Sequence, residues 1–174
     1  RVSSDDSLLR AIAHAPPRVP RQRPLESGAR IGAFRILAEL GAGGMGVVYR
    51  AEDERLGREV ALKVIAASAE HDDASRRRFL REARAAAAVS HPNVATVFEV
   101  SEEGGRIYIA MELASGATLR ARLASGPLDV TEALSIACQI ARGLARAHVN
   151  GVVHRDLKPD NVMVGELVKV LDFG

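Results

Sequence analysis

Aromatic residues are scarce in this chain of 174 residues, which holds no Trp, 2 Tyr and 4 Phe. Proteins that bind single-stranded nucleic acids stack bases on aromatic side chains, and those that bind duplexes cluster basic residues on one face. Lysine is also scarce, because Lys63, Lys158 and Lys169 are the only lysines among 24 basic residues. The remaining arginines are scattered along the chain. We therefore expect no nucleic-acid partner.

Cysteine is nearly absent, since Cys138 is the only one. A single thiol excludes an intrachain disulfide and fits a reducing compartment. No apolar run approaches the roughly 18 residues that a membrane-spanning helix needs, and no signal peptide is recognisable. We expect a cytoplasmic domain without a membrane segment in this sequence, although a longer protein could still be membrane-anchored.

The beginning of the chain differs in composition from the rest. Four of the seven prolines lie between Pro16 and Pro24, interleaved with arginine. Such a segment favours an extended, solvated chain. Residues 1–33 are therefore predicted to form a disordered Pro/Arg-rich linker. The chain starts at Arg1 rather than Met and stops after "VKVLDFG", so we expect it to be a fragment.

Alternating apolar and polar residues begin at Phe34 and predict five strands, with one helix inserted after the third. Glycine-containing turns separate the first and second strands and the fourth and fifth. This order predicts an α+β fold with a five-stranded antiparallel sheet. The strands are expected at 34–40, 46–52, 58–67, 94–100 and 106–113, and the helix at 73–89.

The second part of the sequence is mainly helical. A short helix at 118–126 ends at Gly126-Pro127, and a long helix at 129–151 ends at Gly151. Two short strands then follow a loop and are predicted to form a hairpin around Gly165-Glu166. The apolar positions of the long helix that recur at helical spacing predict a buried stripe, namely Leu134, Ala137, Cys138, Ala141, Leu144, Ala145 and His148.

The stretch "GAGGMG", Gly41 to Gly46, has the spacing G-x-G-x-x-G. This pattern alone is weak, because glycines that let a backbone approach phosphates also simply make turns. In nicotinamide-dependent oxidoreductases a helix opens directly after the glycines. Here "VVYRAE" follows and reads as a strand. The sequence therefore predicts a flap between two strands that covers phosphates, and it argues against an oxidoreductase.

Two charged residues fall among apolar neighbours. Lys63 lies in the predicted strand "VALKV", where an unpaired charge is costly. On a helical wheel Glu82 lies on the apolar face of the 73–89 helix, opposite Arg77, Arg81 and Arg84. One interpretation is that Glu82 orients Lys63 towards a phosphate. The alternative is a partly exposed glutamate at the edge of the apolar stripe.

The loop "HRDLKPDN" places an aspartate, a lysine and an asparagine within six residues. Asp156 could accept a proton from a hydroxyl, and Lys158 could neutralise a phosphoryl group. Asn161 could ligate a hard cation such as Mg²⁺ through its amide oxygen. His154 is interpreted as a structural histidine. The hairpin is expected to bring Asp172 beside Asn161, as a second oxygen ligand.

These motifs occur together in one order: "GAGGMGVV", "VALK", Glu82, "HPNV", "YIAMEL", "HRDLKPDN" and "DFG". In this combination the chain, from Phe34 to Gly174, resembles the amino-terminal part of a bacterial, Hanks-type serine/threonine protein kinase. The resemblance implies a partial kinase domain at 34–174. Its N-lobe would span 34–111, its hinge 112–116, and the start of a truncated, mainly helical C-lobe 117–174.

The resemblance also assigns roles to individual residues. Lys63 would contact the α- and β-phosphates of ATP and pair with Glu82, while Asp156 would be the catalytic base and Lys158 would steady the γ-phosphate. Asn161 and Asp172 would hold Mg²⁺. The ATP site would comprise the glycine loop (Gly41, Ala42, Gly43, Gly44, Met45 and Gly46), the residues around the adenine (Leu40, Val48, Ala61 and Met163), the gatekeeper Met111, and the backbone of Glu112 and Ala114.

The function that this resemblance implies is transfer of the γ-phosphoryl group of MgATP to Ser or Thr hydroxyls of protein substrates. The alternative is a pseudokinase, an ATP-binding or scaffold module without turnover. The presence of Lys63, Glu82, Asp156, Asn161 and Asp172 argues against it. The isolated 174-residue chain is expected to be at best a weak ATP binder without useful turnover.

Overall fold

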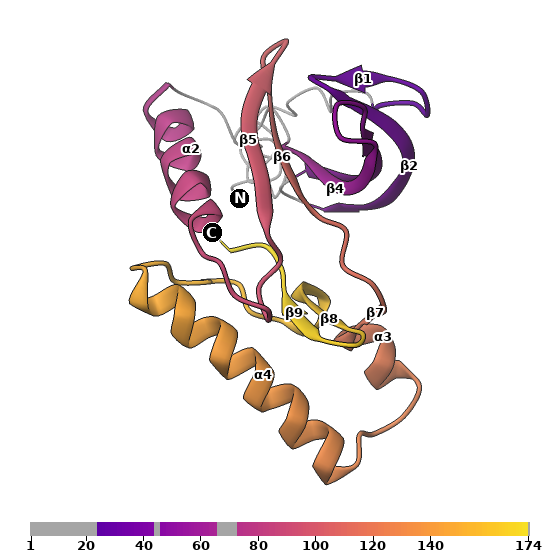
Figure 1. The fold of residues 1–174 in the computed structure, drawn as a ribbon, viewed down its shortest axis with the longest axis vertical. Coiled ribbons are helices and arrows are strands. Elements are labelled where there is room, and N and C mark those ends of the chain that lie inside the picture. The colour runs from indigo at the N-terminus through magenta and orange to yellow at the C-terminus, as the bar shows by residue number, and fades with distance from the viewer. Residues whose placement is uncertain (1–23, 44–45, 66–72, 174) are drawn as a thin grey trace, which may run out of the picture.

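The computed structural model describes residues 24–43, 46–65 and 73–173. Figure 1 shows two halves. The upper half is a strongly curved sheet with one helix beside it, and the lower half is mainly helical. The helix α2 (Asp73–Ala87) lies along the sheet, and α4 (Val130–Val149) forms the lower edge of the molecule. In the described part of the chain, no helix is both long and apolar enough to cross a bilayer.

The upper sheet is antiparallel throughout, in the order β1-β2-β3-β4-β6-β5. All five expected strands are present, so the predicted sheet is confirmed. One two-residue strand was not predicted. The bounds are β1 Arg30–Ile31, β2 Phe34–Gly43, β3 Gly46–Asp53, β4 Arg58–Ile65, β5 Val97–Glu103 and β6 Arg106–Glu112.

The end of the predicted linker belongs to this fold. Ile31 is buried in the core of the sheet, and Leu25 packs against the same core. The backbone N–H of Leu25 donates a hydrogen bond to the hydroxyl of Tyr49 at 2.9 Å. The prediction of a disordered linker is therefore wrong for residues 24–33, because apolar side chains there complete the core. Residues 1–23 lie outside the described part.

The two faces of the upper sheet differ in what they contact. One face forms a closed core that includes Phe34, Tyr49 and Leu62. The other face carries Lys63 directly opposite Val48, and Ala61 directly opposite Met111. Because side chains alternate along a strand, residues 61 and 63 share one face and Leu62 takes the other. The sheet therefore presents Lys63 on the side away from its own core.

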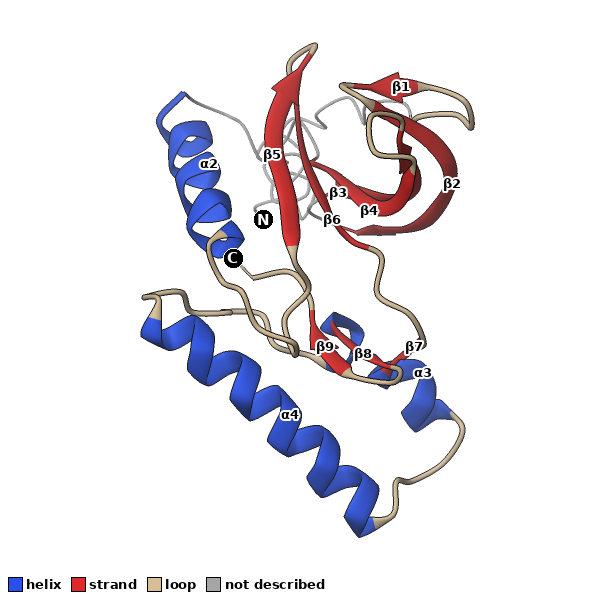
Figure 2. Cartoon of the chain, in the orientation of Figure 1, coloured by secondary structure: helices blue, strands red, loops and turns tan. Residues whose placement is uncertain are grey.

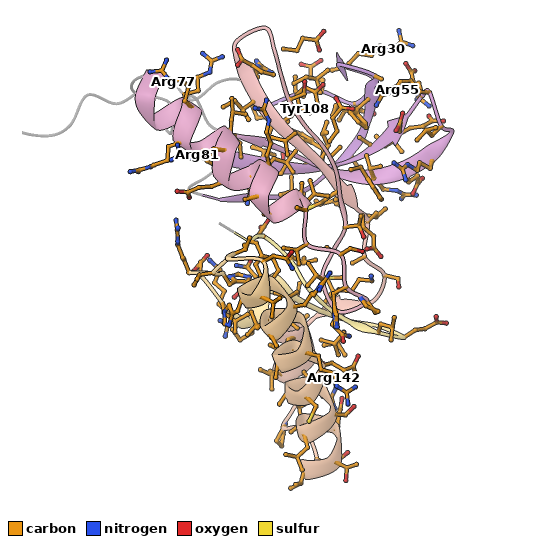
Figure 3. The ribbon with its side chains drawn as sticks, turned by 60° about the vertical axis from the view of Figure 1, so that its left-hand side comes forward. Arg30, Arg55, Arg77, Arg81, Tyr108 and Arg142 are labelled. Carbon is orange, nitrogen blue, oxygen red and sulfur yellow. The ribbon has the colours of Figure 1, made fainter. Side chains whose placement is uncertain are left out.

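The helix α2 covers the β5 edge of the sheet (Figures 1 and 2). Of its residues from 76 to 87, Ala83 and Ala86 are buried. Arg77 and Arg81 project outward from the far side of the helix (Figure 3). The predicted distribution of small apolar residues and arginines on opposite faces is confirmed.

The lower half contains a three-stranded sheet and two helices (Figure 2). Side chains cap both helices: Thr118 accepts from the N–H of Ala121, and Asp129 accepts from the N–H of Glu132. The bounds are β7 Ala117–Thr118, α3 Leu119–Ala124, a 3₁₀ turn Pro159–Asn161, β8 Val162–Val164 and β9 Val168–Val170.

The face of α4 that packs inward differs from the predicted one. The buried residues are Ile136, Gly143 and Ala147, while most of the predicted stripe, including Leu134 and Ala141, is exposed. The helix carries apolar residues around most of its circumference, so periodicity alone does not select one face. The face that packs inward is the one with Gly143, because the helix there comes so close to residue 93 that a Cβ atom would lie 2.8 Å from the carbonyl oxygen of Asn93.

The hairpin β8–β9 has a longer turn than predicted. Val164 pairs with Val168, which leaves residues 165–167 in the turn rather than two residues. Leu167 is consequently a half-exposed turn residue instead of the first residue of β9.

Residues 91–95, part of the connection between α2 and β5, hold the two halves against each other. Val170 donates its N–H to the carbonyl of Asn93 at 2.9 Å, and Ala95 donates to the carbonyl of Val170 at 3.0 Å. This makes a parallel bridge between Val94 and Val170. An apolar cluster of Ala86, Val89, Val94, Ala147 and Val152 fills the junction, with Phe173 packed against it.

Candidate active site

The glycine-rich stretch is a flap between two strands. The pairing of β2 with β3 continues to Gly43 opposite Gly46, and Gly44 and Met45 lie outside the described residues. Gly46 has a φ of +145°, and a Cβ atom there would overlap the carbonyl oxygen of Val64. A strand follows the glycines instead of a helix. The predicted strands on both sides of the glycines are therefore confirmed, and the dinucleotide-binding alternative is wrong.

An apolar wall lies beside the flap. Ala61 and Met111 are both buried and oppose each other across β4 and β6. Val48 is half-buried next to them, and Met163 comes from β8 of the lower half. Leu40, at the exposed end of β2, is 52% accessible. These are the residues that the sequence predicts around an adenine ring.

The connection between the halves begins at Glu112, the last residue of β6. Its N–H is donated to the carbonyl of Thr96 at 2.8 Å, and its carboxylate pairs with Lys169 at 2.8 Å. The N–H is therefore not available to a ligand, so its carbonyl is the group that could contact an adenine edge. Ala114 follows in the loop and has no such restriction among the bonds of the described residues.

Lys63 pairs with Asp172 and not with Glu82. The distance from its Nζ to Oδ1 of Asp172 is 3.0 Å, and its side chain is only 14% exposed. Glu82 instead accepts a hydrogen bond from Nη1 of Arg155 at 2.9 Å. The predicted Lys63–Glu82 pair therefore does not form in this structure.

The positions of the two carboxylates explain this exchange. Glu82 lies at the edge of the buried stripe of α2, with 37% of its side chain exposed, and faces the loop that carries Arg155. Asp172 is brought up from below by β9. A largely buried ammonium group is costly unless it is paired, so Lys63 takes the carboxylate that the lower half supplies.

Residues 154–161, called here the catalytic loop, hold Asp156 between two partners. Nζ of Lys158 lies 2.6 Å from Oδ2 of Asp156. Nδ2 of Asn161 donates to the backbone carbonyl of Asp156 at 2.9 Å and reaches its Oδ2 at 3.4 Å. The hydrogen bond from Lys158 holds the pKa of Asp156 below its usual value, with a smaller contribution from Asn161. The same bond raises the pKa of Lys158.

His154 is buried and structural, as predicted. Its Nδ1 lies 3.3 Å from the N–H of Asp156, and its Nε2 lies 2.8 Å from the carbonyl of Leu171. An acceptor at Nδ1 and a donor at Nε2 satisfy both contacts. The ring also packs on Phe173, with centroids 4.8 Å apart. His154 thereby ties the catalytic loop to the segment that carries Asp172.

The two expected Mg²⁺ ligands lie at adjoining segments. Leu171 donates its N–H to the carbonyl of Asn161 at 2.9 Å, which places Asp172 beside Asn161. Asp172 has a φ of +53°, a conformation that few non-glycine residues adopt. This backbone turn follows β9 by one residue, and the Asp172 side chain that it carries contacts Lys63.

This donor set fits a magnesium ion. The amide nitrogen of Asn161 is used by Asp156, so its oxygen is the atom that remains for a cation. The described residues contain no group of three or more His, Cys, Asp or Glu side chains placed to hold a metal. Mg²⁺ is commonly held by one or two side chains together with phosphate oxygens and water, which is the arrangement that Asn161 and Asp172 permit.

Comparisons with known proteins agree with this geometry. The family model of the protein kinase domain matches residues 34–174. The chain belongs to the protein kinase family. It is 44% identical over 151 residues to the serine/threonine-protein kinase PrkC of Bacillus subtilis, covering 84% of this chain and 23% of that protein. It is 45% identical over 145 residues to the probable serine/threonine-protein kinase PknB of Lactococcus lactis, covering 81% and 23%.

The kinase fold is confirmed by solved structures. The crystal structure of the Mycobacterium tuberculosis PknI kinase domain superposes with a TM-score of 0.79 at 33% identity, covering 86% of this chain and 61% of that one. The chain spans less than a quarter of the length of the curated kinases named above.

Sequence reasoning missed three residues that connect the segments around this site. It gave Arg155 no contact with Glu82, and it gave no role to Asn93 or Gln139, which contact each other at 3.0 Å. The available signals were weak: Asn93 lies in the motif "HPNV", which was given no role, and Gln139 is an uncharged polar residue among Ala, Ile and Cys in an amphipathic helix. No local pattern indicates that its partner lies 46 residues earlier.

Proposed function

We propose that the protein containing this chain transfers the γ-phosphoryl group of MgATP to Ser or Thr hydroxyls of protein substrates. The observation that carries the proposal is the arrangement of the catalytic loop. Nζ of Lys158 lies 2.6 Å from Oδ2 of Asp156, and Asn161 donates a hydrogen bond to the backbone carbonyl of Asp156. The segment after β9 brings Asp172 to Lys63. A reaction that consumes ATP also fits a cytoplasmic location of this domain.

The upper half would bind the nucleotide. The flap would lie over the phosphates, and Ala61, Val48, Met111 and Met163 would enclose the adenine. Nζ of Lys63 lies 3.0 Å from Oδ1 of Asp172, the carboxylate beside which the phosphates would bind. When ATP binds, its α- and β-phosphates would compete with Asp172 for this ammonium group. Asn161 and Asp172 would hold Mg²⁺, which supplies positive charge to the phosphates.

The lower half would carry the transfer itself. Asp156 stays a carboxylate at neutral pH because its pKa is low. It would accept a hydrogen bond from the substrate hydroxyl and orient the oxygen towards the γ-phosphorus. As the new O–P bond forms and the bond to the leaving ADP breaks, the hydroxyl proton would pass to Asp156. Lys158 would neutralise charge on the transferred group, so the protein contributes mainly positioning and electrostatics.

A phosphorylation assay on the full-length protein tests this proposal. Asp156→Asn removes the base, and we expect it to lower turnover with MgATP at least about a thousandfold, as loss of an essential catalytic group does. The control is Asp160→Asn in the same loop. Asp160 is exposed and, among the described residues, its carboxylate pairs with Arg120 alone, at 3.1 Å, outside the site. This variant should keep turnover within about twofold.

Three outcomes separate the alternatives. Loss of activity with retained nucleotide binding in Asp156→Asn supports the kinase. Nucleotide binding without phosphorylation in every protein, wild type included, supports the pseudokinase. Equal losses in Asp156→Asn and Asp160→Asn would show that the assay reports folding of the loop instead of chemistry.

A further inference from the structure

Three segments that are distant in sequence meet at one buried amide. Asn93, in the connection between α2 and β5, is only 5% exposed. Its Nδ2 donates one hydrogen bond to Oε1 of Gln139 on α4, at 3.0 Å, and one to the carbonyl of Val168 on β9, at 2.8 Å. Both amide hydrogens of Asn93 are therefore used to connect α4 with β9.

Gln139 completes a closed set of bonds around the first residue of β9. Its Oε1 accepts a second hydrogen bond, from the N–H of Val168 at 3.0 Å. The carbonyl of Val168 is held by Asn93, and its N–H is held by Gln139. Two side chains thus take the places that a neighbouring strand would supply on this edge.

The same connection also holds the other end of β9. Val170 donates to the carbonyl of Asn93 and accepts from the N–H of Ala95. The close approach depends on Gly143, because any larger residue there would meet the carbonyl of Asn93. Residues 93–95 and Gln139 therefore fix both ends of a strand of only three residues, Val168–Val170.

This strand leads directly to Asp172. Only Leu171 separates β9 from the aspartate, and Leu171 itself is bonded to Asn161 and His154. A displacement of β9 would therefore be transmitted to the carboxylate that meets Lys63. By contrast, Asn93 and Gln139 contact none of Lys63, Asp156, Asn161 or Asp172 through hydrogen bonds of the described residues.

We propose that Asn93 and Gln139 are positioning residues that hold β9 between the α2–β5 connection and α4 and thereby set the place of Asp172 for Mg²⁺. This inference rests on the proposed kinase function, because it names residues that act on the same site. It predicts that loss of the hydrogen bonds at Val168 changes the affinity for Mg²⁺ more than the affinity for the adenine or for a protein substrate.

The chemistry of Gln139 provides a rescue variant. In the part of the chain that the structure describes, only its carbonyl oxygen is used, once for Asn93 and once for Val168. A carboxylate can accept both bonds, whereas the similarly sized thioether of methionine cannot. Gln139 borders an open cavity of about 590 Å³ that is also lined by Arg142, so a carboxylate at this position would stay hydrated. Gln139→Met should therefore fail where Gln139→Glu succeeds.

The test compares three variants of the full-length protein in steady-state phosphorylation assays. Gln139→Met should raise the KM for Mg²⁺ about tenfold, the size of effect typical when residues that support metal ligands are changed. The KM for ATP at saturating Mg²⁺ should stay within about twofold, and Gln139→Glu should restore the wild-type KM for Mg²⁺. The control is Arg142→Met, three residues further along α4, where the side chain is exposed (Figure 3) and makes no hydrogen bond to β9 or to residues 91–95 among the described residues.

A second readout does not depend on activity. Hydrogen exchange of the Val168 amide should become at least about tenfold faster in Gln139→Met and remain slow in Gln139→Glu and Arg142→Met. If the wild-type protein shows no phosphoryl transfer, the proposed function fails, while the exchange rates together with Mg²⁺-dependent ATP binding still decide this inference. It is overturned if Gln139→Met only lowers the melting temperature and leaves both the KM for Mg²⁺ and the Val168 exchange rate unchanged.

Discussion

The two halves of the molecule differ in how completely they bury their apolar residues. The upper sheet encloses a core in which Phe34, Tyr49 and Leu62 are at most 2% exposed. In the lower half, α3 buries no residue, and α4 buries only Ile136, Gly143 and Ala147 of its 20 residues. Leu134 and Val130 on the outer side of α4 are 61% and 75% exposed.

The upper half therefore has its own core, whereas the lower half leaves much of its apolar surface exposed. The upper half has the closed core that an independently stable lobe requires. The lower half is held mainly through its junction with residues 91–95 and through the small sheet β7–β8–β9. The residues proposed to bind ATP lie mostly on the upper half, and those proposed to act on the phosphoryl group lie on the lower half. We therefore expect nucleotide binding to be less sensitive than turnover to changes in the lower half.

The same substitution in each half gives the largest contrast. Leu62→Ala empties a fully buried position and should lower the free energy of unfolding by about 2–5 kcal/mol. Leu134→Ala changes an exposed position and should lower it by less than about 0.5 kcal/mol. Urea denaturation of the 174-residue chain measures both. Equal effects would mean that the outer face of α4 is covered in solution.

Gly143→Ala tests the junction between the halves. Alanine favours a helix by about 1 kcal/mol over glycine, which alone would stabilise α4. The added Cβ would lie 2.8 Å from the carbonyl oxygen of Asn93, a backbone atom that cannot rotate away. We expect this overlap to dominate and to destabilise the chain by about 1–3 kcal/mol. A gain in stability by thermal denaturation would contradict the close packing of α4 on residues 91–95.

A smaller effect is expected from the ion pair between Glu82 and Arg155. Both side chains are partly exposed, at 37% and 61%, so solvent screens their attraction. A double-mutant cycle with Glu82→Gln and Arg155→Gln should give a coupling of at most about 1 kcal/mol, which decreases as salt is added. A larger coupling that resists 1 M salt would show that α2 is held to the catalytic loop more firmly than this contact implies.

The smallest effect concerns the titration of Asp156. Its pKa lies below the ordinary 3.8, chiefly because Lys158 donates a hydrogen bond to it. A lowered pKa contributes stability that is present above the unfolded-state pKa and is lost as the pH falls through the folded value. In Lys158→Met the pKa should move back towards 3.8. NMR titration of the Asp156 carboxyl carbon measures this shift, and an unchanged pKa would exclude the contact with Lys158 in solution.

Much of the fold was predictable because strands with alternating side chains and capped helices leave local signals. The five strands, α2, α3 and α4 are all found near their predicted positions. The buried face of α4 was not predictable, because it depends on the contact between Gly143 and Asn93, which are 50 residues apart in the sequence. The partners of Lys63 and Glu82 were missed for a similar reason. The sequence shows which charges need a partner, and the placement of α2 relative to β9 decides which partner each one takes.

Titration of ATP into the full-length protein, with and without Mg²⁺, tests most directly whether Lys63 and Asp172 form one MgATP site from the two halves. Lys63→Met should weaken ATP binding about tenfold or more under both conditions, since it removes a charge from the phosphates. Asp172→Asn should weaken binding by a similar factor only when Mg²⁺ is present, since it removes a metal ligand. Wild-type affinity in both variants, or an Asp172→Asn effect that does not depend on Mg²⁺, would contradict the account.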